Sequence, residues 1–324
     1  MKIINFIIRV LKRIFRVFLS DRYKTAQHWD QTDSAASSEY WWNFKIIRGF
    51  IQKEITGDAF QTWHQKKISE KPGTFGRVLA FGDGYGMVAE AFIKRKDVKE
   101  IVYLNISKGE GIRFKNLVEK HNFSIPCPFI QADANTFDYS SLGSFDTIID
   151  VGAFHHFENF EFIFPQLNDL LKPGGIMYVD EYVGPSKLKF ERPVIDIIND
   201  WLTSLPGELI ACSKPVTRRD YKKIWQQCGD PSEGIRSGDL DTMLRRYFEL
   251  VEAVSFGGTL LQPFFFTSNM IPCRLNIENW HRTDAGRSEL ERLVRTESEL
   301  INSGEIQKDY MYYIFKKRAR AHGN

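Results

Sequence analysis

Two adjacent histidines, His155 and His156, follow a short apolar run at residues 147–151. A histidine side chain has a pKa of about 6.5 and can accept a proton at neutral pH without special tuning. Each is therefore a candidate general base for a hydroxyl substrate, and each could equally be a loop histidine bonded to the backbone. We expect one of the two to face the site.

The second set of candidates is acidic. Glu181 directly follows another apolar run at 176–179, and Asp150 lies near the end of the earlier one. Glu181 could be the base instead, and with Asp150 and Asp180 it could hold a cation. Because Asp180 and Glu181 are neighbours that would point to opposite sides of a strand, the sequence does not favour this arrangement, and we predict no metal site.

The elements that must position these residues alternate from residue 77 onward. Strands are predicted at 77–81, 101–104, 128–132, 147–151 and 176–179, and helices near 110–121 and at 160–171, the last ended by Lys172-Pro173-Gly174-Gly175. Such alternation is typical of an α/β fold, with a parallel sheet covered on both faces. Ligands then bind at the carboxyl ends of the strands, which is where the histidines and Glu181 stand.

A glycine-rich turn, GDGYG at 82–86, separates the first strand from a helical run. It lets a ligand approach the backbone and exposes helix N–H groups to an anion. Met87 replaces the third glycine of a dinucleotide fingerprint and Asp83 would repel a pyrophosphate, so NAD is disfavoured. A zwitterionic amino-acid moiety with a neighbouring sulfonium suits the turn better, since its carboxylate can meet the helix N-terminus.

Four segments occur in order over residues 77–181: VLAFGDGYG, ADANTFD, FDTIIDVGAFHHF and LLKPGG. Their order and spacing resemble the motifs of class I S-adenosylmethionine-dependent methyltransferases. Residues 248–256 and 309–316 resemble the sixth strand and the antiparallel seventh strand of that fold. The resemblance implies a Rossmann-like seven-stranded sheet in the order 3-2-1-4-5-7-6, with helices on both faces.

The resemblance also assigns the cofactor site. It implies that Gly82, Asp83, Gly84 and Gly86 line the methionine moiety of S-adenosylmethionine, Asn105 and Ile106 the ribose, Asp133 and Ala134 the adenine, and that Asp150 and Gly152 lie near the sulfonium. Ala80 and Asn105 stand where the family usually has acidic residues. An amide can still donate to and accept from a diol, so Asn105 is expected to keep the ribose role.

The N-terminal segment, residues 1–24, carries seven basic residues and one acidic residue, so the other 300 residues have 37 basic against 40 acidic side chains. In residues 1–20 the polar positions recur every three or four residues, which predicts one helix with a basic stripe and a wide apolar face. Its longest uncharged stretch is too short to span a bilayer. We expect it to lie on an anionic membrane surface, although docking on its own domain or on a partner is the alternative.

The predicted organisation has three parts: the helix at 1–24, a helical cap at 25–75 and a methyltransferase domain at 76–324 with an acceptor-site insertion at 182–245. The cap is rich in tryptophan, and we expect two of its aromatic side chains to face the acceptor. Four widely spaced cysteines predict neither a disulfide framework nor a zinc site, and fit a reducing compartment.

Shorter segments are similar to a bacterial subgroup associated with polysaccharide and cell-envelope gene clusters: YWWN at 40–43, DEYVGP at 180–185, DPSEGIRS at 230–237 and GGTLL at 257–261. The resemblance therefore implies an O-methyltransferase, cytoplasmic and peripheral on the inner face of the cell membrane, acting on a sugar hydroxyl of a lipid-linked or envelope glycan. The alternatives are methylation of a lipid or small metabolite, and a non-catalytic scaffold. Nucleic acid is not expected as a partner, because the body of the chain is net acidic and no N-P-P-Y-type turn follows the fourth strand.

Overall fold

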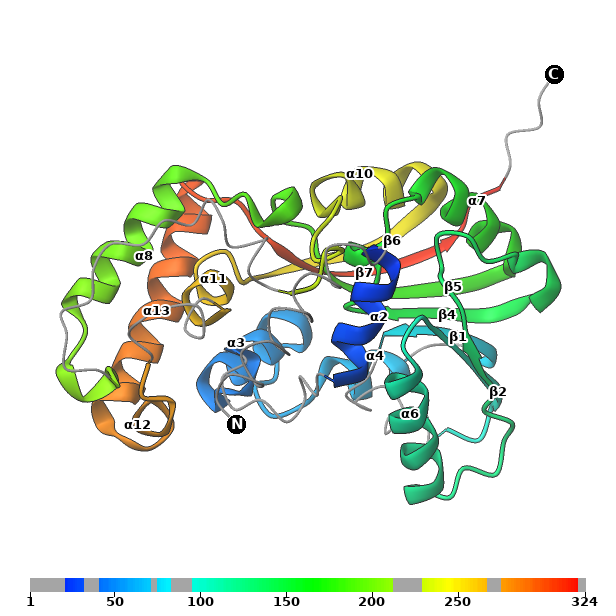
Figure 1. Ribbon diagram of the computed structural model, residues 1–324, viewed down its shortest axis with the longest axis horizontal. Coiled ribbons are helices and arrows are strands. Elements are labelled where there is room, and N and C mark those ends of the chain that lie inside the picture. Colours follow the sequence, from blue (N-terminus) through cyan, green and yellow to red (C-terminus); the bar gives the residue numbers. More distant parts are fainter. Residues whose placement is uncertain are drawn as a thin grey trace, which may run out of the picture.

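The structure is a computed structural model that describes residues 21–31, 41–70, 75–82, 95–211, 229–266 and 275–319. Its centre is a seven-stranded sheet in the order β3-β2-β1-β4-β5-β7-β6 (Figure 1). β7 runs antiparallel to β5 and β6, and the other neighbouring pairs are parallel. This confirms the predicted fold. The strands are β1 (Gly76–Gly82), β2 (Val98–Asn105), β3 (Phe129–Gln131), β4 (Phe145–Val151), β5 (Leu171–Tyr182), β6 (Phe248–Gly257) and β7 (Tyr310–Lys317).

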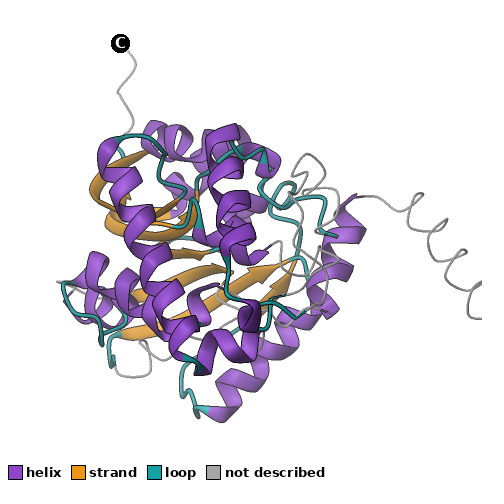
Figure 2. Ribbon diagram, turned by 90° about the vertical axis from the view of Figure 1, so that its left-hand side faces the viewer, coloured by secondary structure: helices purple, strands orange, loops and turns teal. Residues whose placement is uncertain are grey.

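The central strands are apolar on both faces, as expected for a covered parallel sheet. In β1 the side chains of Val78 and Ala80 belong to one buried cluster, while those of Leu79 and Phe81 belong to another on the opposite face. Successive side chains of a strand point to opposite faces, so this uninterrupted apolar run requires a cover of helices on each side. Figure 2 shows the sheet with helices on both faces.

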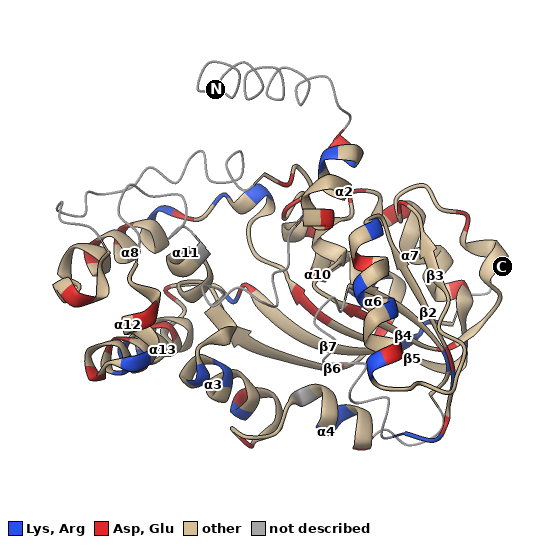
Figure 3. Ribbon diagram, turned by 60° about the horizontal axis from the view of Figure 1, so that its bottom comes forward, with Lys and Arg blue, Asp and Glu red and all other residues tan. Residues whose placement is uncertain are grey.

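The helices that cover the sheet divide between its two faces. The first cluster includes residues of α3 (Lys45–Thr56) and α4 (Trp63–Glu70), and Phe114 of α6 (Lys108–Lys120) packs against it. The second cluster includes residues of α7 (Phe160–Leu170) and α10 (Ser237–Tyr247). Basic and acidic side chains alternate along α6 (Figure 3), where Arg113 pairs with Glu110 at 2.6 Å and Lys115 with Glu119 at 3.8 Å.

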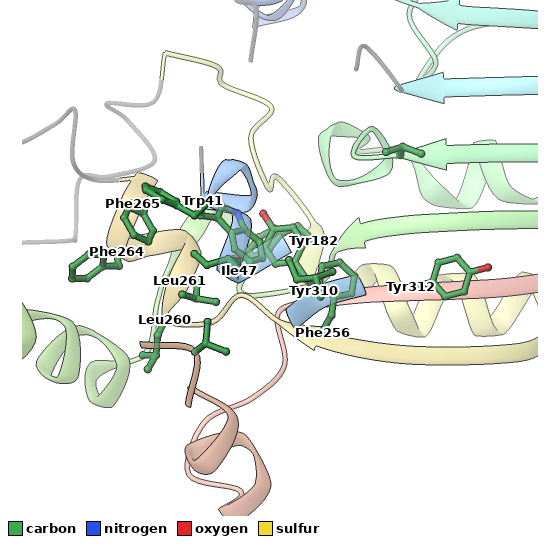
Figure 4. Packing of buried hydrophobic residues seen from close by; sticks show 14 of the residues in the cluster. Trp41, Ile47, Tyr182, Phe256, Leu260, Leu261, Phe264, Phe265, Tyr310 and Tyr312 are labelled. Carbon is green, nitrogen blue, oxygen red and sulfur yellow. The ribbon is translucent and has the colours of Figure 1, made fainter. Parts of the chain in front are cut away.

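A helical lobe adjoins the β6 and β7 side of the sheet (Figure 1). Trp201 holds two of its helices together: its Nε1 donates to Glu289 at 2.8 Å, and the Arg292 guanidinium lies 4.0 Å from its ring centroid. Aromatic and aliphatic side chains fill the junction between lobe and sheet, among them those labelled in Figure 4. The lobe consists of α8 (Arg192–Ser204), α11 (Leu261–Phe266), α12 (Ile277–Arg282) and α13 (Asp284–Ser303).

A buried carboxylate fixes the turn between β6 and α11. Glu297 of α13 accepts hydrogen bonds from the backbone N–H groups of Gly258, Leu260 and Leu261 at 2.7, 2.6 and 3.0 Å. Burial raises the pKa of Glu297, and these three donors oppose the rise. One side chain thus satisfies three backbone donors at the base of the lobe.

The start of β5 differs most from the predicted elements. α7 ends at Leu170, and β5 begins at Leu171 rather than at Ile176. Leu171 pairs with Phe145 and Ile176 with Thr147, so the pairing register shifts between these two positions. The Lys-Pro-Gly-Gly segment is therefore an irregular lead into β5, and not a loop that separates helix from strand.

The predicted cap does not lie in one place. α3 packs against β6 and α13, and Trp41 and Phe44 beside it are buried in the core with Tyr310 and Phe265. α2 (Asp21–Gln31) instead lies beside α6, where Asp30 Oδ1 accepts from the backbone N–H of Gly109 at 2.8 Å. α2 therefore lies near the carboxyl ends of β2 and β3, whereas Trp41 meets Tyr310, which pairs with Tyr182 at the end of β5.

Short 3-10 helices complete the described chain: Trp41–Asn43, Tyr139–Leu142, Phe154–His156, Ser186–Leu188 and Gly207–Leu209. Within the described ranges, no helix combines the length and the apolar character that crossing a bilayer requires. The predicted membrane-surface helix, residues 1–20, lies outside these ranges.

Candidate active site

Those residues predicted to bind the donor that the structure describes lie at or next to the carboxyl ends of β1, β2, β3 and β4. Gly82 ends β1 beside Val151 of β4. Its φ is +70°, and a Cβ there would lie 2.0 Å from the carbonyl oxygen of Val151, so only glycine fits. The rest of the predicted turn, with Asp83, Gly84 and Gly86, lies outside the described residues.

Asn105 ends β2 with its side chain held by its own turn. Its Oδ1 accepts from the backbone N–H of Ser107 at 2.9 Å, and its Nδ2 donates to the hydroxyl of Tyr103 at 3.1 Å. The next residue, Ile106, is only partly buried. The turn places both residues where the ribose is predicted, and their role stays a prediction.

Asp133 and Ala134 follow β3 underneath α2. Asp133 Oδ1 accepts from the backbone N–H of Asn135 at 3.0 Å, and its Oδ2 lies 3.5 Å from Nε of Arg22 on α2. Ala134 is buried, and its carbonyl accepts from the Tyr139 hydroxyl at 3.0 Å. Local hydrogen bonds thus fix both predicted adenine residues, and the Asp133 carboxylate also contacts Arg22 of α2.

Asp150 and Gly152 end β4 at the centre of the edge. The Asp150 carboxyl is fully buried and accepts from the backbone N–H of Phe154 at 3.1 Å. Burial and the nearby carboxylate of Glu181 raise the pKa of Asp150 well above its usual range. Gly152 has a φ of +64° and donates its N–H to the carbonyl of Asp180 at 2.9 Å. Together these bonds set the position of the short helix Phe154–His156.

His155 forms a buried pair with Glu181 of β5. Its Nδ1 lies 2.7 Å from Glu181 Oε2, and its backbone N–H donates to Oε1 at 3.3 Å. Burial alone would lower the pKa of His155, but Glu181, with Glu233 and Asp230, outweighs it and raises the pKa to about 9. Glu181 does not reach outward as a base: it is fully buried and holds the imidazole.

His156 is held by a different carboxylate. Its Nδ1 lies 3.1 Å from Ser232 Oγ and 3.3 Å from Asp230 Oδ2. Burial and the neighbouring charge of His155 lower the pKa of His156 to about 3. The expectation of an untuned imidazole is therefore wrong for both histidines, since burial and the surrounding carboxylates move their pKa values in opposite directions.

Glu233 brings the two histidines together. Its Oε1 lies 3.8 Å from His155 Nε2, and its Oε2 lies 3.9 Å from His156 Nε2. The two rings themselves have centroids 4.0 Å apart. Burial raises the pKa of Glu233 to about 7, opposed by His155. Both histidines face the same carboxylate; His155, His156 and Glu233 are called the triad below.

Trp29 of α2 closes one side of the triad. Its Nε1 donates to Asp230 Oδ2 at 2.8 Å, and its ring meets the His156 ring edge-on at a centroid distance of 5.3 Å. Asp230 Oδ1 also accepts from the Thr25 hydroxyl of α2 at 2.9 Å. Helix α2 therefore contacts both the predicted adenine site, through Arg22, and the triad, through Trp29.

Glu233 and Asp230 were missed by sequence reasoning as functional residues. Both lie in the segment 230–237, for which the sequence indicates only a resemblance to other proteins and no functional role. Nothing in their spacing indicates that the insertion returns to the end of β4. Arg236 of the same segment pairs with Glu161 at 2.8 Å and with Asp239 at 3.0 Å.

Comparisons with known proteins agree with this fold. Residues 79–179 match a protein family described as a methyltransferase domain. The mycolic acid cyclopropane synthase CmaA1, solved with SAH and CTAB, is 17% identical, with a TM-score of 0.51 and coverage of 91% of this chain and 98% of its own. The cyclopropane synthase MmaA2 from Mycobacterium tuberculosis is 14% identical, with a TM-score of 0.49 and coverage of 92% and 99%.

A putative methyltransferase from Bacillus halodurans is 17% identical, with a TM-score of 0.44 and coverage of 79% of this chain and 97% of its own. No curated protein matches the chain. At 17% identity the likeness to CmaA1 shows a shared fold. The residues that match the methyltransferase domain family extend from β1 to β5.

Proposed function

We propose that this chain, a class I S-adenosylmethionine-dependent methyltransferase, methylates a sugar hydroxyl of a lipid-linked or cell-envelope glycan at the membrane surface. The enzyme class rests on the methyltransferase domain at 79–179 and on the order of the sheet. S-adenosylmethionine is the methyl donor of that class. The acceptor and the membrane location are the proposed part.

The donor would lie along the carboxyl edge from β1 to β4. Gly82 allows close approach at β1, Asp133 offers a carboxylate oxygen for the exocyclic amine of adenine, and Asp150 and Gly152 stand at the sulfonium end. Asn105 and Ile106 would contact the ribose between them. This order follows the strand order β3, β2, β1, β4, so one extended ligand can touch all four strand ends.

The observation that supports a hydroxyl acceptor is the triad, which lies beside the end of β4, where the sulfonium is predicted. Methyl transfer to oxygen forms a C–O bond, breaks the C–S bond and releases S-adenosylhomocysteine and the hydroxyl proton. A group that activates the hydroxyl must therefore lie within reach of the transferred methyl. His155 and His156 follow Gly152 by three and four positions, and Glu181 holds the first of them in place.

The membrane assignment is supported by the sequence before α2. Residues 1–20 have a basic stripe and a wide apolar face, which favours an in-plane helix on anionic lipids of the inner leaflet. α2 begins at Asp21, directly after this segment, and contacts both halves of the site. A membrane-bound N-terminus would thus keep the site close to a lipid-linked acceptor.

The test is methyl transfer from donor labelled in its methyl group to fractionated membranes of the native host. We expect label in the lipid-linked oligosaccharide fraction, as an O-methyl sugar after hydrolysis, and loss of that sugar from the envelope when the gene is deleted. Label in phospholipid or in a small metabolite would replace the glycan with that acceptor. No transfer to any fraction, despite binding of the donor in calorimetry, would favour a scaffold.

A further inference from the structure

We propose that the triad, His155, His156 and Glu233, binds one divalent transition-metal ion. This goes beyond the methyl transfer proposed above, because it depends on neither the donor nor the identity of the acceptor. Two imidazoles and one carboxylate are the donor set that suits zinc, iron, cobalt and manganese.

The first argument is the convergence of three donor atoms. One donor atom from each of these side chains can be chosen so that all lie within 4.8 Å of one another, and this is the only such group of histidine, cysteine or acidic residues in the described part of the chain. Glu233 lies 3.8 Å from one Nε2 and 3.9 Å from the other. Ligands of a tetrahedral ion with bonds of about 2.0–2.1 Å lie about 3.3 Å apart, so the three donor atoms would have to approach one another by up to about 1.5 Å, and a water would supply the fourth ligand.

The second, independent argument is the bonding of the far side of each ring. His155 Nδ1 lies 2.7 Å from Glu181, and His156 Nδ1 lies 3.3 Å from Asp230 and 3.1 Å from Ser232. The Glu181 carboxylate can only accept, so His155 Nδ1 carries the proton. The Ser232 hydroxyl donates to Asp230 Oδ1 at 2.7 Å, so its oxygen is left to accept from His156 Nδ1, and both Nε2 atoms lie on the side of Glu233. Histidine ligands of metals show this pattern, in which an outer carboxylate fixes the tautomer and the direction of the ring.

The third argument is charge. Three carboxyl groups, those of Glu181, Asp230 and Glu233, lie within 4 Å of the two imidazoles. A divalent cation bound at the triad would be attracted by this concentration of acidic groups.

The site differs from an all-carboxylate cation site at Asp150, Asp180 and Glu181. There Glu181 already bonds His155, and its oxygens lie inside the sheet edge. The triad instead lies beyond the strand ends, where its side chains keep some exposure. Hard ions such as Mg²⁺ prefer an all-oxygen shell, so the imidazoles should exclude Mg²⁺ in favour of softer ions.

The test uses the full-length protein without a histidine tag, treated with a chelator and then dialysed. Titration with Co²⁺ should give visible d–d bands of a low-coordinate site that saturate at one ion per chain, and Zn²⁺ should displace them stoichiometrically. Millimolar Mg²⁺ should leave the bands unchanged. If the wild-type protein gives no saturable bands and calorimetry detects no Zn²⁺ binding, the proposal is overturned.

Variants assign the ligands. His155→Ala, His156→Ala and Glu233→Gln should each weaken Co²⁺ binding by more than about 100-fold, and Glu181→Gln should weaken it by about 10–100-fold through His155. His121→Ala, a histidine at the end of α6, is the matched control and should bind Co²⁺ as the wild type does. Unchanged Co²⁺ binding in the three ligand variants would place the ion elsewhere and reject the site.

Binding of S-adenosylhomocysteine, measured by calorimetry on each variant, separates this proposal from the proposed function. Retained binding shows that a variant has folded and that its loss of Co²⁺ is local. Metal binding without methyl transfer would uphold the ion and reject the enzyme. Donor binding and methyl transfer in a protein that binds no metal would support the enzyme and reject the metal site.

Discussion

Nε of Arg22 lies 3.5 Å from Oδ2 of Asp133, the carboxylate predicted to recognise adenine. The arginine comes from α2 and the aspartate from the turn after β3, two segments more than 100 positions apart in sequence. A donor that places its adenine at Asp133, as predicted, must share this carboxylate with the arginine or displace it. Since the Arg22 side chain is 58% exposed, the pair stabilises the free protein by no more than about 1 kcal/mol.

This relationship predicts opposite effects of two substitutions on donor binding. Asp133→Asn should weaken binding of S-adenosylhomocysteine by about tenfold or more, because the acceptor for the adenine amine loses its charge. Arg22→Ala should change it by less than about fivefold, in the direction of tighter binding. Isothermal titration calorimetry measures both. Equal affinity of Asp133→Asn and the wild type would remove the adenine assignment.

Replacement of both histidines should slow methyl transfer severely. His155→Ala and His156→Ala together are expected to lower kcat by about 10²–10⁴, the usual contribution of a group that activates a hydroxyl. His121→Ala is the control and should retain the wild-type rate. A loss of less than tenfold in the double variant, with donor binding intact, would show that neither histidine activates the acceptor.

Stability should fall with rising pH through Asp309, the buried residue before β7. Its Oδ2 has no hydrogen-bond partner within the described chain, and burial, with Glu297 and Glu191, raises its pKa to about 7. The unfolded value is about 3.9, so between these values the folded state binds more protons. The free energy of unfolding therefore decreases as the pH rises from about 4 to 7, by up to about 1.4 kcal/mol per pH unit from this group.

Asp309→Asn should remove that contribution, and urea unfolding at several pH values measures it. The difference in unfolding free energy between variant and wild type should grow from pH 4 to pH 7 in favour of the variant. Parallel stability curves for the two proteins would mean that Asp309 titrates normally.

Glu297→Ala should destabilise the protein by more than about 3 kcal/mol. The substitution leaves three backbone N–H groups, those of Gly258, Leu260 and Leu261, without their acceptor in a buried turn, at about 1–3 kcal/mol each. Glu297→Gln keeps one carbonyl oxygen and should cost less. Thermal and urea unfolding of the two variants give the order, and a Gln variant less stable than the Ala variant would contradict this account.

Removal of residues 1–20 should abolish binding to anionic liposomes. The segment contains five basic residues, each of which contributes about 1 kcal/mol to binding free energy near an anionic surface. It also carries the wide apolar face that would enter the lipid. Sedimentation with phosphatidylserine vesicles compares the truncated and full-length chains, with phosphatidylcholine vesicles as the control. A truncated protein that still pellets with phosphatidylserine would locate the membrane contact elsewhere.

The sheet could be predicted because its signals are local. Each central strand is a short apolar run between turn residues, and the order of the strands followed from motifs that resemble a known family. The start of β5 could not be predicted in the same way. Pro173 and Gly174 indicate a break, but pairing with Phe145 extends the strand back to Leu171.

The site is assembled by contacts between residues far apart in the sequence, and no local pattern predicts these contacts. Ser232 and His156 bond across 76 positions, through an insertion whose path has no local signal. The histidines themselves could be found from their place after β4. Their pKa values could not, since these depend on Glu181 and Asp230, which the fold buries beside them.

Helix α2 touches the site twice, through Arg22 at the turn after β3 and through Trp29 at Asp230. It has only 11 residues, and Asp30 near its C-terminal end accepts from Gly109 in the first turn of α6. If the donor displaces Arg22 from Asp133 and α2 responds as a unit, the surface that the acceptor meets at Trp29 changes as well. By thermodynamic linkage each ligand would then alter the affinity of the other by the same factor, and the two substrates would bind cooperatively or antagonistically.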